Sequence, residues 1–68
     1  MEKETRRILE KIRQKRLDKK LSLLNLANDV GISNSHLYYI ESKKVIPSID
    51  LIVKITKALD FPLKDLLE

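Results

Sequence analysis

The feature that most constrains the fold is the only glycine of this 68-residue chain, Gly31, which separates two short stretches with helical spacing. Glycine adopts a left-handed backbone conformation without the steric cost that a Cβ atom imposes, so it suits the turn after a helix. Ala27, four residues earlier, offers a small side chain where two helices can cross closely. Two short helices joined by about three to four residues that include a glycine form a helix-turn-helix. The segment "LANDVGISNSHLYYIES", residues 26–42, therefore predicts this motif.

Apolar residues recur at helical spacing along the rest of the chain, and no stretch shows the alternation typical of a strand. We expect a first helix over about residues 4–19 and a second that ends near Asp29. Serines are placed to cap the later helices, and a Phe-Pro step separates the fourth helix from a short fifth one. These boundary residues are Ser22, Ser33, Ser48, Phe61 and Pro62. The chain therefore predicts an all-α fold, in which residues 1–68 form one compact five-helix domain with the helix-turn-helix in its second and third helices.

The net charge of +4 is concentrated near the start of the chain. Residues 1–20 contain nine basic and four acidic side chains, whereas acidic side chains slightly outnumber basic ones over residues 45–68. A basic region on a small domain fits a polyanionic partner such as nucleic acid. A solvated helix face is the alternative that the charge alone leaves open.

Few side chains in this sequence could perform catalysis or hold a metal ion. The chain has no cysteine and a single histidine, His36, and its carboxylates are not clustered. A nucleophile–base pair or a metal site needs several such groups close together, so we expect no enzyme activity, no cofactor and no metal. No apolar run is long enough to span a membrane, and no signal peptide is evident. We therefore expect a cytoplasmic location, which the absence of cysteine suits.

Four segments of the chain share the pattern of one protein family. They are "IRQKRLDKKLS", "NLANDVGIS", "SHLYYIES" and "PSIDLIVKITKALDFPLKDLL". Through them, residues 8–67 resemble the helix-turn-helix domain of the phage repressor and Cro-like, or Xre, family. The resemblance implies five helices packed as a globule, with the third helix in the major groove of DNA. Small stand-alone relatives, including the controller proteins of restriction–modification systems, dimerise through their C-terminal helices.

The resemblance implies that one face of the third helix reads DNA bases. Asn34, Ser35 and Tyr39, with Tyr38 as a further candidate, stand where family members place base-reading side chains. Asparagine can pair with adenine through two hydrogen bonds, serine can donate or accept, and a tyrosine ring can lie against a thymine methyl group. The alternative is that these are merely polar surface residues of a helix.

Other positions match residues that contact the DNA backbone in this family. Such contacts set the register and the affinity of a complex without reading its sequence. Ser22 stands at the positive end of its helix, and two lysines follow the third helix. We expect His36 either to contact a backbone phosphate or to make no contact with DNA. The candidate phosphate contacts are Ser22, His36, Ser42, Lys43, Lys44, Arg13 and Lys15.

Arg16 and Glu41 match an arginine and a glutamate that pair across the first and third helices in repressors of this type. A planar guanidinium suits a bidentate pair with a carboxylate. We expect this ion pair to orient the third helix without touching DNA. Two independent surface charges are the alternative.

The chain departs from the family pattern at two kinds of position. The family usually has a glutamine just after the Ser22 position, where it contacts phosphate, whereas this chain has Leu23, followed by the equally apolar Leu24. Glycines that commonly end the first, third and fourth helices are also replaced. A left-handed backbone at each replacement would cost on the order of 1 kcal/mol. The replacing residues are Lys20, Lys43 and Asp60.

The fourth predicted helix and its approach, "VIPSIDLIVKI", are apolar on more than one face. A helix of that kind is buried on more than one face, and a second subunit is the natural cover in so small a chain. A slightly apolar monomer surface is the alternative. The expected dimer interface comprises Val45, Ile46, Ile49, Val53, Leu63 and Leu67.

Together these features predict a homodimeric, sequence-specific DNA-binding regulator of transcription. Its recognition helix, about residues 33–42, would enter the major groove of double-stranded DNA at a near-palindromic operator with half-sites roughly 34 Å apart. No part of the chain suggests a small-molecule ligand. The alternative is a protein-interaction module, antitoxin-like or an adaptor, that keeps the fold but binds DNA weakly. The apolar fourth helix favours it, and so do Leu23 and Leu24, whose side chains offer no hydrogen bonds.

Overall fold

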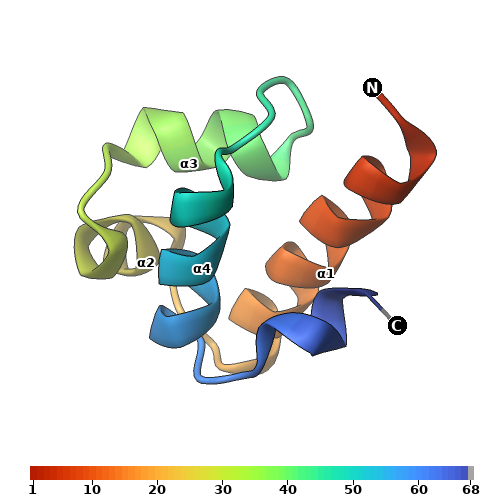
Figure 1. The fold of residues 1–68 in the computed structure, drawn as a ribbon. Helices are drawn as coiled ribbons and strands as arrows, with labels where there is room; N and C mark the ends of the chain where they lie inside the picture. Colours follow the sequence, from red (N-terminus) through yellow and green to blue (C-terminus); the bar gives the residue numbers. More distant parts are fainter. Residues whose placement is uncertain (68) are drawn as a thin grey trace.

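The computed structural model describes residues 1–67, and all secondary structure in this part of the chain is helical. In chain order the elements are α1 (Lys3–Asp18), α2 (Leu23–Val30), α3 (Asn34–Glu41), α4 (Ile49–Ala58) and the 3-10 helix η1 (Leu63–Leu67). As Figure 1 shows, α2 packs against both α3 and α4, while α1 packs against α3 and η1. The predicted all-α class and the helix-turn-helix over α2 and α3 are confirmed.

The count of five α-helices is not confirmed, because the last element is a 3-10 helix. Its five residues follow Pro62, and the N–H of Asp65 donates to the Pro62 carbonyl at 3.0 Å. This bond joins residues three apart, as is typical of short helical segments. So few residues offer too few α-helical hydrogen bonds to offset the entropy lost in starting an α-helix.

Each α-helix begins at a side chain that caps its first free N–H groups. The hydroxyl oxygens of Ser22, Ser33 and Ser48 accept from the backbone N–H three residues later, at 3.0, 3.0 and 3.1 Å respectively, as predicted. At the start of α1 the carboxylate of Glu2 accepts from the N–H of Glu4 at 3.0 Å. That backbone hydrogen bond is the main reason why the pKa of Glu2 lies below its ordinary value. The three serine caps each stabilise their helix by about 1 kcal/mol.

All four α-helices end in the same left-handed turn, although only one of them uses glycine. Gly31 has a φ of 85°, and Lys20, Lys43 and Asp60 have φ values of 57°, 67° and 58° at the corresponding turns. In each turn, the N–H of the residue that follows the left-handed residue donates to the carbonyl five residues earlier, at 2.9 to 3.2 Å. A Cβ atom at Gly31 would meet no atom within 4 Å, so its backbone angle, not crowding, favours glycine there. The three non-glycine turns each carry a strain of about 1 kcal/mol.

The core is built from apolar side chains of every helix. Ala27 is completely buried, which fits the close crossing of α2 that its small size predicts. Burying one leucine or isoleucine stabilises the fold by about 1.5–3 kcal/mol, so these side chains hold α3 against its neighbours. The fully buried large side chains are Leu9, Ile12, Leu26, Leu37, Ile40, Ile55, Leu59 and Leu66.

The part of the chain that the structure describes contains neither a membrane-spanning helix nor a metal-ligating cluster. Among residues 1–67, no helix is both long and apolar enough to cross a bilayer, which takes about 20 apolar residues. The longest helix, α1, has 16 residues and carries many charges. The same residues contain no group of three histidine, cysteine, aspartate or glutamate side chains that could hold a metal ion.

Candidate nucleic-acid interface

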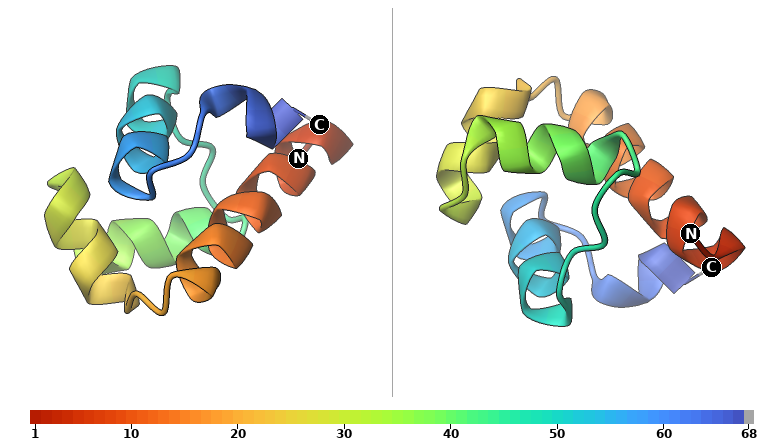
Figure 2. Two further views of the ribbon diagram at one scale, coloured as in Figure 1. Left: turned by 90° about the horizontal axis from the view of Figure 1, so that it is seen from below. Right: turned by 90° about the horizontal axis from the view of Figure 1, so that it is seen from above.

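α3 lies at the surface, with one side turned toward the core and the other toward solvent. Leu37 and Ile40 are fully buried, because residues three apart lie on the same side of a helix. In the view from above, Figure 2 shows that no other element covers α3. The exposed residues of this helix are Asn34, Ser35, His36, Tyr38 and Tyr39. The structure therefore brings all four predicted base-reading residues to one exposed helix surface.

Tyr38 and Tyr39 are the largest side chains of the exposed α3 surface. Their ring centroids are 5.7 Å apart, and the planes meet at 63°, an edge-to-face arrangement. A contact of this kind restrains both rings, which lowers the side-chain entropy that binding would remove. The pair therefore forms an ordered surface that combines apolar ring area with two hydroxyl groups.

A hollow of about 250 Å³ lies between α1, the start of α2 and the end of α3. Its residues include Leu23 of α2, so the leucine at the position where the resemblance leads one to expect glutamine lies beside α3. Arg13 also lines the hollow and exposes nearly half of its side chain, and its guanidinium lies 3.7 Å from Oε2 of Glu10. The complete lining is Arg13, Arg16, Leu23, Tyr38, Glu41 and Ser42.

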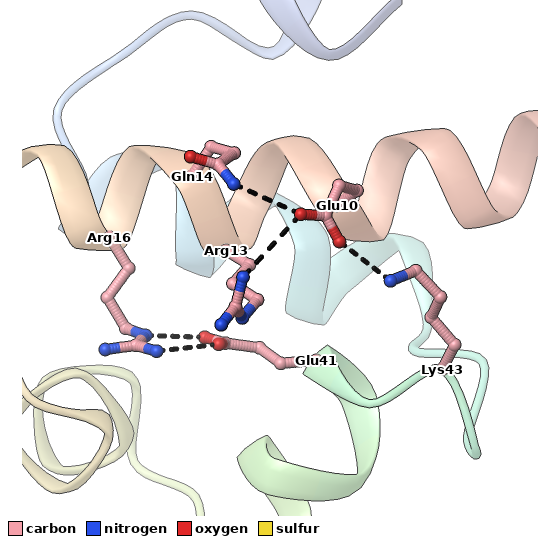
Figure 3. Close-up of polar contacts among 6 residues, drawn as sticks. All are labelled: Glu10, Arg13, Gln14, Arg16, Glu41 and Lys43. Carbon is pink, nitrogen blue, oxygen red and sulfur yellow. Dashed lines mark hydrogen bonds and ion pairs between the residues drawn. The ribbon is translucent and has the colours of Figure 1, made fainter.

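Arg16 and Glu41 form a buried, side-on ion pair between α1 and α3. The guanidinium donates from Nε to Oε2 at 2.8 Å and from NH2 to Oε1 at 3.0 Å (Figure 3). Its NH1 donates to the carbonyl of Leu21 at 2.7 Å, so the same side chain also fastens the connection between α1 and α2. The two side chains are only 11% and 6% exposed. This geometry holds the end of α3 at a defined angle to α1.

Lys43, predicted to contact phosphate, instead bonds to α1. Its ammonium lies 2.7 Å from Oε1 of Glu10, and its side chain is 26% exposed. Gln14 donates to the other carboxylate oxygen of Glu10 at 3.2 Å. The hydrogen bonds from Lys43 and then Gln14 hold the pKa of Glu10 below its ordinary value. The positive charge of Lys43 is therefore already paired before any DNA arrives.

Two of the serines predicted to contact phosphate are engaged within the chain. Ser42 donates its hydroxyl to the carbonyl of Tyr38 at 2.7 Å, one turn back along α3. Ser22 accepts from the N–H of Asn25 as the cap of α2. Both residues are exposed, but only Ser22 still has its O–H free to donate, because a serine hydroxyl carries a single hydrogen. Ser22 can therefore donate to a phosphate from its present position, whereas Ser42 would first have to give up its bond to the Tyr38 carbonyl.

The remaining candidate phosphate contacts lie in different places. Lys44 is exposed in the loop after α3, and His36 is exposed in the first turn of α3. Lys15 is not brought to this surface, because its ammonium lies 5.2 Å from the ring centroid of Phe61, beyond α4. That position suits a cation–π contact, and it turns Lys15 toward the connection between α4 and η1. The phosphate contact predicted for Lys15 therefore does not fit the structure.

The residues predicted for a dimer interface lie on α4, the loop before it and η1. Ile46, Ile49, Leu63 and Leu67 are exposed, and Ile49 is the most exposed at 72%. Both views of Figure 2 place α4 and η1 on one side of the molecule, apart from α3. Val45 and Val53 are partly buried, and Val45 packs against the core. An apolar surface therefore lies on a different side from the exposed face of α3.

Sequence reasoning assigned no role to Glu10 or Gln14. Their spacing of four residues indicates that the two side chains can touch on α1, which they do. The bond between Glu10 and Lys43, however, joins residues 33 positions apart. No signal along the chain indicates that contact, because it depends on how the loop after α3 packs on α1.

Comparison with known families agrees with this geometry. A sequence model of the helix-turn-helix family matches residues 12–66, which span from the middle of α1 into η1. Comparisons with the curated proteins and with the solved structures found no match. The matched residues include α2, the left-handed turn at Gly31 and the exposed α3, which are the parts of the motif. This chain therefore belongs to the Xre-like helix-turn-helix family of DNA-binding regulators.

Proposed function

We propose that the chain acts as a single DNA-binding domain that regulates transcription by recognising a specific operator as a homodimer. The observation that carries this proposal is the exposed face of α3, held in place by the core and by the buried ion pair at its end. A rigid helix with polar and aromatic groups suits the major groove, which is about 12 Å wide and presents a different pattern for each base pair.

The residues on this face have the chemistry that base reading requires. Asn34 and Ser35 are the first two residues of α3, and the N-terminal part of a recognition helix contacts base edges. In this proposal Asn34 pairs with an adenine, and Ser35 donates to or accepts from a neighbouring base. Tyr38 and Tyr39, one turn later, lie against thymine methyl groups or donate from their hydroxyls.

Phosphate contacts would come from the elements on either side of α3. Arg13 offers a partly exposed guanidinium beside Tyr38, while Lys44 is exposed in the loop after α3 and His36 in the first turn of α3. The start of α2 adds free backbone N–H groups and the hydroxyl of Ser22, a favourable seat for an anion. These contacts would set the affinity and the register, and α3 would set the specificity.

The homodimer in this proposal uses the apolar side formed by α4 and η1. Ile46, Ile49 and Leu67 are exposed there, and covering them with a second copy would remove apolar area from water at about 25 cal/mol per Å². A two-fold pair of this kind presents two α3 helices to successive major grooves. The operator would then be near-palindromic, with half-sites about 34 Å apart.

The test is selection of binding sites from a random duplex library, followed by affinity measurements on the selected duplex and a scrambled one. We expect a palindrome that binds about 10³-fold more tightly than the scramble. Asn34→Ala should lose about 1–3 kcal/mol and relax the preference at one position in each half-site. The matched control is Asn28→Ala, which removes the same kind of side-chain amide from an exposed position of α2. It should change neither the affinity nor the base preference.

A second function is favoured by one observation, the apolar start of α2. Leu24 is 54% exposed, and Leu23 lines the hollow beside α3, so neither side chain offers a hydrogen bond to DNA. A protein-interaction module would use these leucines to bind another protein. In that case the selection would return no motif, and only a salt-dependent affinity for any duplex would remain.

A further inference from the structure

Glu10 places one carboxylate between two cations beside the recognition helix. Its Oε1 accepts from Lys43 at 2.7 Å, while its Oε2 accepts from Gln14 at 3.2 Å and lies 3.7 Å from NH1 of Arg13. Figure 3 shows this Glu10 cluster, with Arg13 and Gln14 on α1 and Lys43 reaching over from the loop after α3. The cluster lies next to the Arg16–Glu41 pair but shares no atom with it.

The bond between Glu10 and Lys43 contributes little to folding. Glu10 is 42% exposed, and ion pairs that are exposed to solvent stabilise a protein only slightly. Lys43 also occupies a left-handed turn with a φ of 67°, which is a strained conformation for a residue other than glycine. The larger consequence of the pair is therefore its effect on the charge of the surface.

That surface is where a DNA backbone would pass. Lys43 follows α3 by two residues, and Arg13 lines the hollow beside Tyr38. Affinity for DNA depends on how many phosphates the protein neutralises, and a carboxylate beside these cations cancels one positive charge. Lys43 and Glu10 together bring no net charge to the complex, whether or not the ammonium moves to a phosphate.

We propose that Glu10 is an internal competitor for DNA phosphate, holding Lys43 and lowering the sequence-independent part of the affinity. The inference rests on the proposed function, since it concerns how strongly the same surface attracts a DNA backbone. Because phosphate contacts carry no sequence information, the effect of Glu10 applies equally to operator and to other DNA. Recognition by this protein then depends more on the base contacts of α3.

Glu10→Gln tests this directly, because glutamine keeps the shape of the side chain and removes only the charge. One extra neutralised phosphate makes the slope of log affinity against log salt steeper by about 0.9. Between about 50 and about 200 mM salt, the advantage of the variant over the wild type should therefore shrink by about 3.5-fold. The gain should appear on the selected duplex and on the scrambled duplex alike.

Two further variants assign the effect to the proposed contact. In a protein that already carries Lys43→Gln, adding Glu10→Gln should change the salt slope by less than half of the change that it causes in the wild type, because the lysine that Glu10 would release is absent. Asp60→Asn removes one negative charge at the far end of α4, at a left-handed position that asparagine tolerates well, and should leave the slope unchanged. Fluorescence anisotropy supplies the affinities, and thermal unfolding confirms that each variant is folded.

The outcomes separate this inference from the proposed function. If the wild type binds the duplexes and Glu10→Gln binds more weakly or with the same slope, Glu10 merely positions Lys43 and the competitor role is overturned. An equal change in Glu10→Gln and Asp60→Asn would overturn it too, because net charge alone would then account for the effect. If the wild type binds no duplex at all, the proposed function fails, and this inference fails with it.

Discussion

Glu41→Ala removes one half of the buried ion pair between α1 and α3, and we expect it to destabilise the fold strongly. Glu41 is 6% exposed and Arg16 is 11% exposed, so the remaining guanidinium stays largely out of water. Its NH1 keeps the carbonyl of Leu21 at 2.7 Å, but Nε and NH2 lose acceptors at 2.8 and 3.0 Å. Removing one partner of such a pair costs about 3–5 kcal/mol. Because one acceptor is kept, we expect about 3 kcal/mol, the lower end of that range.

A loss of that size is a large share of the total, since a domain of this length is stable by roughly 3–10 kcal/mol. Urea unfolding followed by far-ultraviolet circular dichroism measures the loss as a lower midpoint with an unchanged slope. The control is Glu41→Leu combined with Arg16→Met, which replaces both charges by apolar groups and should recover most of the stability. A loss below about 1 kcal/mol for Glu41→Ala would refute the reasoning, because an exposed ion pair contributes no more than that.

Three other changes test separate parts of the structure. Lys20→Gly relieves a φ of 57° and should raise the free energy of unfolding by about 1 kcal/mol in a urea titration; no gain would mean that this turn is unstrained. Ile49→Glu changes a side chain that is 72% exposed, so in sedimentation the proposed dimer should become a folded monomer; unchanged sedimentation of a dimer would place the interface elsewhere. The third change concerns pH. The hydrogen bond from Lys43 lowers the pKa of Glu10 below its ordinary value of 4.5. The stability that this pair contributes is therefore present above pH 4.5 and is lost as the pH falls through the lower pKa of the folded protein. Lys43→Gln should therefore flatten the loss of stability below that pH, and identical acid profiles in the two proteins would contradict the role of the pair.

Local features of the sequence were enough to predict the helix boundaries and the turn. Ser22, Ser33 and Ser48 each bond to an N–H three residues away, and the left-handed turn at Gly31 closes within five residues. Interactions that short depend on neighbours along the chain. The exposed face of α3 could be predicted for the same reason, since helical spacing alone separates its buried side from its solvent side.

The surroundings of the basic residues of α1 could not be predicted from local sequence. Arg13 and Lys15 are two positions apart, which is about 200° around a helix, so they leave α1 in nearly opposite directions. Both were predicted to contact phosphate, but Arg13 lines the hollow beside α3 whereas Lys15 lies over the ring of Phe61. The positions of α3 and Phe61 around α1 decide which of the two cations lies beside α3.

The sequence by itself thus determined the four α-helices, the serine caps of three of them, the left-handed turn at Gly31 and the residues that α3 exposes, because each depends on contacts within a few residues. Only the tertiary structure decided that Lys43 bonds to Glu10, 33 residues away, at 2.7 Å. It also replaced the expected fifth α-helix by a 3-10 helix. The physical reason is that an ion pair between distant residues forms only after the core has brought their helices together. The pairing of charges at the α3 surface is therefore a consequence of packing.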